Sequence, residues 1–126
     1  MNYNLQVINL PQRMRAVGFV KSRKSYEKIH EICRNISRVG FSKRIYVSDF
    51  IVDETAGTDI DRSAIDRLVG RLEYGDVECV MVNSVFDITR DVDDLAQFFW
   101  HLNQLDCKLY SIEEKGFIPI ELEDEE

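Results

Sequence analysis

Three polar segments of the chain carry the residue types that bind or attack phosphate. They span residues 21–25, 53–62 and 83–90, and their cationic members are Lys21, Arg23, Lys24, Arg62 and Arg90. Guanidinium and ammonium groups neutralise phosphate oxygens, and a serine hydroxyl attacks phosphorus once it is activated. The first segment holds two such hydroxyls, on Ser22 and Ser25. The three segments therefore predict a site for an anion such as phosphate.

Other kinds of site find no support in the sequence. Neither G-x-x-x-x-G-K-[ST] nor G-x-G-x-x-G occurs, which disfavours a nucleoside triphosphate or a dinucleotide as ligand. Cys33, Cys79 and Cys107 lie far apart without C-x-x-C spacing, which argues against a zinc site and a disulfide framework. We therefore expect no metal, no cofactor, and a cytoplasmic protein with reduced cysteines. His30 and His101 fall on predicted helices away from the polar segments, so neither is expected to act as a catalytic base.

Short apolar runs alternate with amphipathic segments along the chain. Strands are predicted at 16–20, from 45, at 77–82 and at 109–112, and helices are predicted after Ser25, from about Asp61 to Gly75, and over 91–105. Ser25 is expected to cap the first helix and Gly40 to end it. This alternation predicts a three-layer α/β fold with a mostly parallel central sheet and helices on both faces. Each polar segment follows a predicted strand, so we expect the three to meet at the carboxyl ends of the strands, where such sheets bind ligands.

The alternation of strands and helices covers residues 15–116, which we expect to form one domain. Residues 1–14 are interpreted as an arm or an edge strand. Residues 117–126 are interpreted as an acidic tail, in which the alternation of Ile118, Ile120 and Leu122 with polar residues also suits an edge strand. No apolar run approaches the roughly 20 residues of a membrane span, and the start of the chain lacks a signal-peptide pattern. We therefore expect no membrane contact.

The net charge of −7 is distributed unevenly along the chain. Between residues 11 and 46 there are ten basic residues and two acidic ones, whereas from residue 49 onward there are 21 acidic and six basic residues. Affinity for nucleic acid comes mainly from neutralising phosphates. We therefore expect DNA binding by this chain alone to be weak or indirect, with a basic patch in the first third or a merely solvated surface as the two alternatives.

The last predicted helix has an aromatic side chain off its apolar stripe. Val92, Leu95, Phe99 and Leu102 mark the stripe, with Phe98 at its margin, and Trp100 falls well away from it. Aromatic residues are enriched in interfaces, so Phe98 and Trp100 are candidates for a contact with a protein partner or with a second copy in a dimer. A tryptophan lying across its own helix is the alternative.

Five short motifs in a fixed order resemble the catalytic domain of resolvase/invertase-type serine recombinases. They cover about residues 15–115 and are Gly18-Phe19-Val20-Lys21, Val52 to Thr58 followed by Asp61-Arg62, Gly75-Asp76-Val77-Glu78, Asp87 to Asp91, and Leu109 to Ile112. The resemblance implies the three-layer α/β fold described above. It also implies a reaction in which a serine hydroxyl attacks a DNA phosphodiester while arginines stabilise the charge on the phosphorus oxygens.

The chain departs from the family pattern at the residues that perform the cleavage. Arg23 stands at the position that matches the nucleophilic serine, Lys21 replaces an arginine, and Asp87 replaces another arginine. The family-matching residues that remain are Asp53, Gly57, Arg62 and Arg90. The family's domain continues into a long helix and a DNA-binding domain, whereas ten acidic-rich residues follow Gly116 here, as expected of an excised domain or of a naturally short relative.

Three hypotheses follow from this pattern. The leading one is a degenerate recombinase-like domain that does not cut DNA and acts through protein contacts in a recombination or mobile-element context. The second is an active site-specific recombinase that uses Ser22 or Ser25 as its nucleophile. The third is an anion- or phosphate-binding module built from the cations of the three polar segments, with Lys21, Arg23, Arg62 and Arg90 as its main ligands.

Overall fold

The computed structural model describes residues 13–118, and the statements below concern this range. Its strands are β1 (Met14–Lys21), β2 (Ile45–Asp53), β3 (Cys79–Val82), β4 (Lys108–Ser111) and β5 (Gly116–Phe117). Its helices are α2 (Tyr26–Ser42), α3 (Ser63–Tyr74), α4 (Val92–Gln104) and the short 3₁₀ helix η1 (Val85–Asp87).

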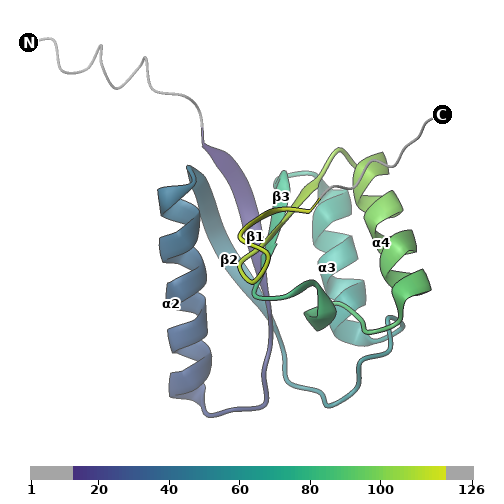
Figure 1. The fold of residues 1–126 in the computed structure, drawn as a ribbon, viewed down its shortest axis with the longest axis horizontal. Helices are drawn as coiled ribbons and strands as arrows, with labels where there is room; N and C mark the ends of the chain where they lie inside the picture. Colours follow the sequence, from purple (N-terminus) through teal and green to yellow (C-terminus); the bar gives the residue numbers. More distant parts are fainter. Residues whose placement is uncertain (1–12, 119–126) are drawn as a thin grey trace, which may run out of the picture.

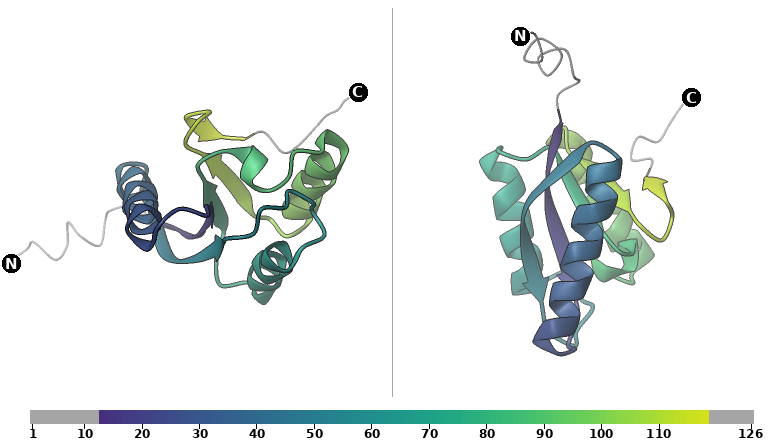
Figure 2. Two further views of the ribbon diagram at one scale, coloured as in Figure 1. Left: turned by 90° about the horizontal axis from the view of Figure 1, so that it is seen from below. Right: turned by 90° about the vertical axis from the view of Figure 1, so that its left-hand side faces the viewer.

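The five strands form one sheet in the order β2-β1-β3-β4-β5. The first four strands in the chain are parallel, and β5 pairs antiparallel with β4. Helix α2 covers one face of the sheet, while α3 and α4 cover the other (Figures 1 and 2). The predicted three-layer α/β fold is therefore confirmed.

Alternation along β1 divides the core into two clusters. Val17 and Phe19 pack against side chains of α3 and α4, whereas Ala16 and Val20 pack on the other face with Ile36 of α2. All four strand residues are at most 2% exposed. A central strand buried on both faces needs a nearly continuous apolar run, which the sequence supplies between Ala16 and Val20.

Two glycines permit close approaches between elements. A Cβ on Gly18 would clash with the Phe50 ring, so the glycine allows this ring of β2 to lie over β1. A Cβ on Gly40 would lie 2.8 Å from the carbonyl oxygen of Ile45. The prediction that Gly40 ends its helix was wrong, because α2 continues to Ser42 and the glycine lets the last turn approach β2.

The other predicted helix ends are confirmed. The Ser25 hydroxyl accepts a hydrogen bond from the Lys28 amide at 3.2 Å and caps α2. Gly75 ends α3 in the left-handed conformation, with φ of 92°. The Asp91 carboxylate caps α4 by accepting a hydrogen bond from the Asp94 amide at 3.0 Å.

The buried stripe of α4 is rotated from the predicted one. Leu95, Phe98 and Leu102 are buried, whereas Val92 is 71% exposed. The placement of Phe98 at the margin of the stripe was wrong, because the spacing of three and four residues from Leu95 to Phe98 to Leu102 directs it into the core. Trp100 is 58% exposed, as its predicted position off the stripe requires.

The sheet extends slightly beyond residues 15–116 at both ends. Met14 already pairs with Ile45 in β1, and Phe117 pairs with Tyr110 in β5. The sheet therefore includes residues that the sequence assigned to the arm and the tail. Most of the predicted arm, together with Ile120, Leu122 and the rest of the tail beyond Ile118, lies outside the described residues. No helix between residues 13 and 118 is long and apolar enough to cross a membrane.

Candidate functional site

Three loops meet at the carboxyl ends of the parallel strands, which we call the C-terminal edge. Residues 22–25 follow β1, residues 54–62 follow β2 and residues 83–91 contain η1 and follow β3. Because β1 lies between β2 and β3, the three loops are neighbours at the lower end of the molecule in Figure 1. The structure therefore brings together the three polar segments that the sequence singled out.

Asp53 organises the C-terminal edge from the end of β2. Its side chain is 1% exposed, and its Oδ1 accepts hydrogen bonds from the Thr55 amide at 3.0 Å and the Thr55 hydroxyl at 2.7 Å. Its Oδ2 accepts a hydrogen bond from Arg62 Nε at 2.7 Å and pairs with Lys21 Nζ at 3.4 Å. Burial raises the pKa of Asp53, but the hydrogen bonds from Thr55 and Arg62 outweigh it and lower the pKa to about 2. The carboxylate is therefore ionised and surrounded by donors.

Arg62, immediately before α3, ties the second and third loops together. Its Nη1 donates to the carbonyl oxygens of Asp59 and Ile88, and its Nη2 donates to that of Asp87, each at 2.7 Å. With the bond from Nε to Asp53, four of the five guanidinium N–H groups are used within the protein. The side chain is 9% exposed. Arg62 therefore holds the loops in place and has little capacity left for a ligand.

Lys21 is also bound to protein groups. Its ammonium donates to the carbonyl oxygen of Thr55 at 2.6 Å and pairs with Asp53, and its side chain is 14% exposed. Two of the four cations assigned to the predicted phosphate site thus share one buried carboxylate. One negative charge offsets part of their two positive charges, and both groups are bound within the protein before any ligand arrives.

The two serine hydroxyls are turned toward the backbone. Ser22 is 8% exposed, and its hydroxyl oxygen accepts a hydrogen bond from the Lys24 amide at 3.1 Å. Ser25 caps α2 through its hydroxyl oxygen. Both hydroxyls therefore stabilise the loop between β1 and α2.

The exposed cations at the C-terminal edge flank a shallow pocket. It has a volume of about 450 Å³ and is lined by Lys21, Ser22, Arg23, Lys24, Thr55 and Ala56. Arg23 and Lys24 are exposed there, whereas Arg90 is exposed on the third loop. Within residues 13–118, none of these three side chains forms a hydrogen bond or an ion pair.

Asp87 places a carboxyl group beside the cations, at the end of η1. Burial raises its pKa to about 6, and the nearby charge of Glu113 contributes in the same direction. A backbone hydrogen bond from Ser84 and the charges of Lys21 and Arg62 oppose this rise without cancelling it. An arginine at this position would add positive charge to the site, whereas Asp87 adds a group that becomes negative near neutral pH.

Several contributors to this site have no signal in the sequence. Thr55 binds Asp53 with both its amide and its hydroxyl, and the buried Thr89 donates its hydroxyl to the carbonyl oxygen of Thr58 at 2.9 Å. Glu113 comes from the turn after β4, and its charge raises the pKa of Asp87.

Gly57, one of the family-matching residues, has no structural role that requires glycine. A Cβ added there would meet no atom within 4 Å, and its φ lies outside the left-handed region.

Two further features bear on the chemistry available to the described part of the chain. Residues 13–118 contain no group of three histidine, cysteine, aspartate or glutamate side chains able to hold a metal ion.

Of the two aromatic residues proposed as an interface, Trp100 is on the surface and Phe98 is 5% exposed within the core. Of these two residues, Phe98 is therefore not available for a surface contact.

Comparison with known proteins identifies one family and one fold. The family model of the resolvase N-terminal domain matches residues 20–125. The structure is similar to the N-terminal catalytic domain of TP901-1 integrase, with a TM-score of 0.70 and 18% identity over 82% of this chain and 80% of that one. It is also similar to the C-terminal catalytic domain of ISC1926 TnpA, an IS607-like serine recombinase, with a TM-score of 0.69 and 17% identity over 79% of this chain and 67% of that one. No curated protein matches the chain in sequence.

Proposed function

Since the chain belongs to the family of resolvase N-terminal domains, we propose that it is a recombinase-type domain that does not cut DNA and that acts through contacts with other proteins. Cleavage by the family's reaction requires a serine hydroxyl aimed at a phosphodiester and cations around the phosphorus oxygens. The positions of Ser22, Lys21 and Arg62 at the C-terminal edge argue against both arrangements.

The buried hydroxyl of Ser22 is the observation that carries this proposal. Arg23 stands where the family pattern has its nucleophile, so a neighbouring serine would have to replace it. Ser22 is 8% exposed and its oxygen is bonded to the Lys24 amide, while Ser25 is bonded to the Lys28 amide. Because a displacement of about 1 Å can cost on the order of 10²-fold in rate, these positions argue against either hydroxyl replacing the nucleophile.

The electric field at the C-terminal edge supports the same proposal. Asp53 binds both Lys21 and Arg62, so its single charge offsets part of theirs and both groups are already engaged within the protein. Asp87 then adds a carboxyl group with a pKa of about 6 where the family pattern has an arginine. A phosphate undergoing attack gains negative charge, and this field would not stabilise it.

A supercoiled-plasmid nicking assay tests the proposal. We expect no nicking above background by the wild-type chain, with a cutting-competent member of the family as positive control. The variants Ser22→Ala and Ser25→Ala are expected to match the wild type. The variant Arg23→Ser returns a hydroxyl to the family position but removes one of the exposed cations and keeps Asp53 and Asp87, so we expect it to remain inactive. Nicking that disappears in Ser22→Ala or Ser25→Ala would instead support an active recombinase.

The surface of α4 is the part of the molecule that we assign to protein contacts. Trp100 is 58% exposed and Val92 is 71% exposed on this helix. A large exposed aromatic ring releases water when a partner covers it, which favours association. We propose self-association as a dimer, with Trp100 rather than Phe98 in the contact.

The extent and location of the domain are part of the proposal. We propose one domain whose sheet runs from Met14 to Phe117, with residues 1–13 and 118–126 flanking it. Cys33, Cys79 and Cys107 are free thiols, and burial raises the pKa of each. Thiols without a partner suit a reducing compartment, so we place the chain in the cytoplasm.

The pocket beside Arg23 and Lys24 favours one alternative function, an anion-binding module. Both cations are exposed beside a cavity of about 450 Å³, and the neighbouring Lys21 is 14% exposed. Titration with inorganic phosphate tests this alternative by calorimetry. Saturable binding that is lost when Arg23 and Lys24 are both replaced by alanine would favour it over a contact-only role.

A further inference from the structure

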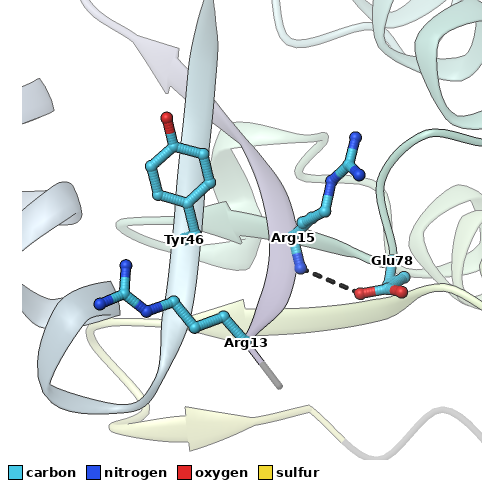
Figure 3. A pocket seen from close by; sticks show the side chains of 4 residues that line it. All are labelled: Arg13, Arg15, Tyr46 and Glu78. Atoms are coloured by element: carbon cyan, nitrogen blue, oxygen red, sulfur yellow. Dashed lines mark hydrogen bonds between the residues drawn. The ribbon is translucent and has the colours of Figure 1, made fainter. Parts of the chain in front are cut away.

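A groove crosses the opposite edge of the sheet, which is formed by the amino ends of the strands and which we call the N-terminal edge. One part has a volume of about 460 Å³ and is lined by Arg13, Arg15, Tyr46 and Glu78 (Figure 3). An adjoining part of about 360 Å³ shares Arg13 and Glu78 and adds Met14, Asp106 and Lys108. Volumes of about 300–1,000 Å³ are usual for small-molecule sites. The function proposed above makes no use of this groove.

The register of the sheet places an aromatic ring beside a guanidinium group. Arg15 of β1 is paired with Tyr46 of β2, so both side chains leave the sheet on the same face. The Tyr46 ring is 51% exposed. In Figure 3 the ring stands above the side chain of Arg13 and to the left of that of Arg15, with Glu78 beyond Arg15.

The two arginines keep their charge available. Arg13 lies 5.4 Å from the centre of the Phe41 ring, a cation–π contact that orients the guanidinium group without using its N–H donors. Within residues 13–118, neither guanidinium group forms a hydrogen bond or an ion pair. Asp76, whose charge interacts with Arg15, is itself hydrogen-bonded to Arg71 at 2.9 Å. Phosphate oxygens can therefore approach both arginines.

Glu78 gives the groove an acceptor as well. Its Oε1 accepts a hydrogen bond from the Arg15 amide at 2.9 Å, which fixes the carboxylate at the groove wall. Its other oxygen can accept a hydrogen bond from an amino group, such as the one that cytosine carries. The carboxylate also repels phosphate, which confines an anion to the side of the groove that holds the arginines.

We propose that the groove at the N-terminal edge binds a nucleotide unit, with its base stacked on Tyr46 and its phosphate held by Arg13 and Arg15. A flat aromatic ring next to cations is the combination that binds single-stranded nucleic acid, because every base has a π-face and every nucleotide a phosphate. The pocket beside Arg23 and Lys24 has cations but no aromatic lining residue, so it lacks the stacking surface. The same chemistry serves a free nucleotide or a strand, and Lys108 farther along the groove would meet a neighbouring phosphate of a strand. This inference does not depend on whether the domain cuts DNA.

Fluorescence anisotropy with a labelled short deoxycytidine oligonucleotide tests the inference on the full chain at low salt. Unlabelled deoxycytidine monophosphate and inorganic phosphate serve as competitors. We expect the monophosphate to displace the probe at concentrations where inorganic phosphate does not. An oligonucleotide that binds far more tightly than the monophosphate identifies a strand as the ligand, and equal affinities identify a free nucleotide.

Matched variants separate this groove from general electrostatic attraction. Replacing Arg13 and Arg15 together by alanine is expected to weaken binding at least tenfold and to make it less dependent on salt. Replacing Lys28 and Arg38 on the exposed side of α2 makes the same change in net charge and is expected to alter affinity less than twofold.

The stacking contact has its own pair of variants. Tyr46→Leu keeps an apolar side chain but loses the ring, so we expect binding about tenfold weaker, whereas Tyr46→Phe is expected to bind as the wild type does. Unfolding midpoints equal to that of the wild type show that these exposed positions leave the fold intact. No binding of any nucleotide, unchanged affinity in the double arginine variant or in Tyr46→Leu, or inorganic phosphate competing as well as the monophosphate would each overturn the inference.

Discussion

The two edges of the sheet carry similar cationic side chains in different states. At the C-terminal edge, Lys21 and Arg62 are both bound to Asp53, and Arg62 uses four of its five N–H groups within the protein. At the N-terminal edge, the guanidinium groups of Arg13 and Arg15 line an open groove. The number of cations at an edge therefore does not by itself define an anion site. The availability of these cations to a ligand depends on whether a buried carboxylate already binds them.

The difference between the edges originates in one side chain. Asp53 is 1% exposed, and an ionised carboxylate in that position requires positive partners and hydrogen-bond donors. Glu78 is exposed at the N-terminal edge, and it meets a backbone amide rather than a guanidinium group. Water can solvate Glu78, so the fold does not require the nearby arginines to neutralise it.

The largest effect is expected from Asp53→Asn. The amide side chain still offers Thr55 an acceptor but leaves Lys21 and Arg62 without their counter-charge, so we expect a loss of about 3 kcal/mol in the free energy of unfolding near neutral pH. Urea unfolding measures this loss, with the exposed Asp61→Asn as the matched control. The folded-state pKa of Asp53 is lowered from its usual 3.8 to about 2, so its contribution is present above pH 3.8 and fades as the pH falls through 2. Equal effects of the two substitutions would remove the proposed difference between the edges.

The next effect compares one conservative substitution at both edges. Lysine keeps the charge of arginine but lacks the planar guanidinium group. Arg62→Lys would therefore lose the hydrogen bonds to the carbonyl oxygens of Asp59, Ile88 and Asp87. We expect a loss of about 2 kcal/mol by urea unfolding. Arg15→Lys is expected to change stability by less than about 0.5 kcal/mol, as is usual for exposed positions. A similar cost at both edges would show that Arg62 is no more committed to the fold than Arg15.

A smaller, opposite effect is expected from Asp87→Asn. The folded-state pKa of Asp87 is raised from 3.8 to about 6, so the folded state favours the protonated carboxyl, and this advantage is lost as the pH rises through 6. The substitution should therefore stabilise the fold by about 1 kcal/mol well above pH 6, a figure reduced for partial exposure to solvent, and should have no effect below pH 3.8. Thermal unfolding at both pH values measures the difference. Destabilisation at high pH would mean that Lys21 and Arg62 need Asp87 as a partner.

The smallest effect on stability is expected from Trp100→Ala. The ring is 58% exposed, so we expect a change of less than about 0.5 kcal/mol in the free energy of unfolding. Light scattering is expected to show a lower molar mass for this variant than for the wild type if the ring lies in a dimer contact. Tyr26→Ala, which removes a 75% exposed ring from the other layer, is the control and should leave the molar mass unchanged. A wild-type chain that is monomeric at high concentration would contradict the assignment.

Much of the fold follows from periodicity in the sequence. The apolar run from Ala16 to Val20 predicted a buried strand, and in the structure this strand lies between β2 and β3. Gly75 marked the end of α3 because a left-handed residue favours glycine. The same argument predicted a helix end at Gly40 and was wrong, because this glycine permits a close approach to β2. The sequence offers no sign of which role a glycine has.

The sequence predicted which residues belong to the candidate site but not which of them bind one another. The sequence placed Lys21, Asp53 and Arg62 near one another because each follows a parallel strand. It did not reveal that a single carboxylate would bind both cations, since that depends on burial and on Thr55 holding the carboxylate. The groove at the N-terminal edge was missed because Arg15 and Tyr46 become neighbours only through the register of β1 and β2.

Trapping of a covalent protein–DNA adduct tests the central claim most directly. The full chain would be incubated with labelled duplex and supercoiled DNA and analysed under denaturing conditions. We predict no adduct with the wild type, because the Ser22 hydroxyl is buried against the Lys24 amide and the inner cations are bound to Asp53. An adduct that forms with the wild type and disappears in Ser22→Ala would contradict the account.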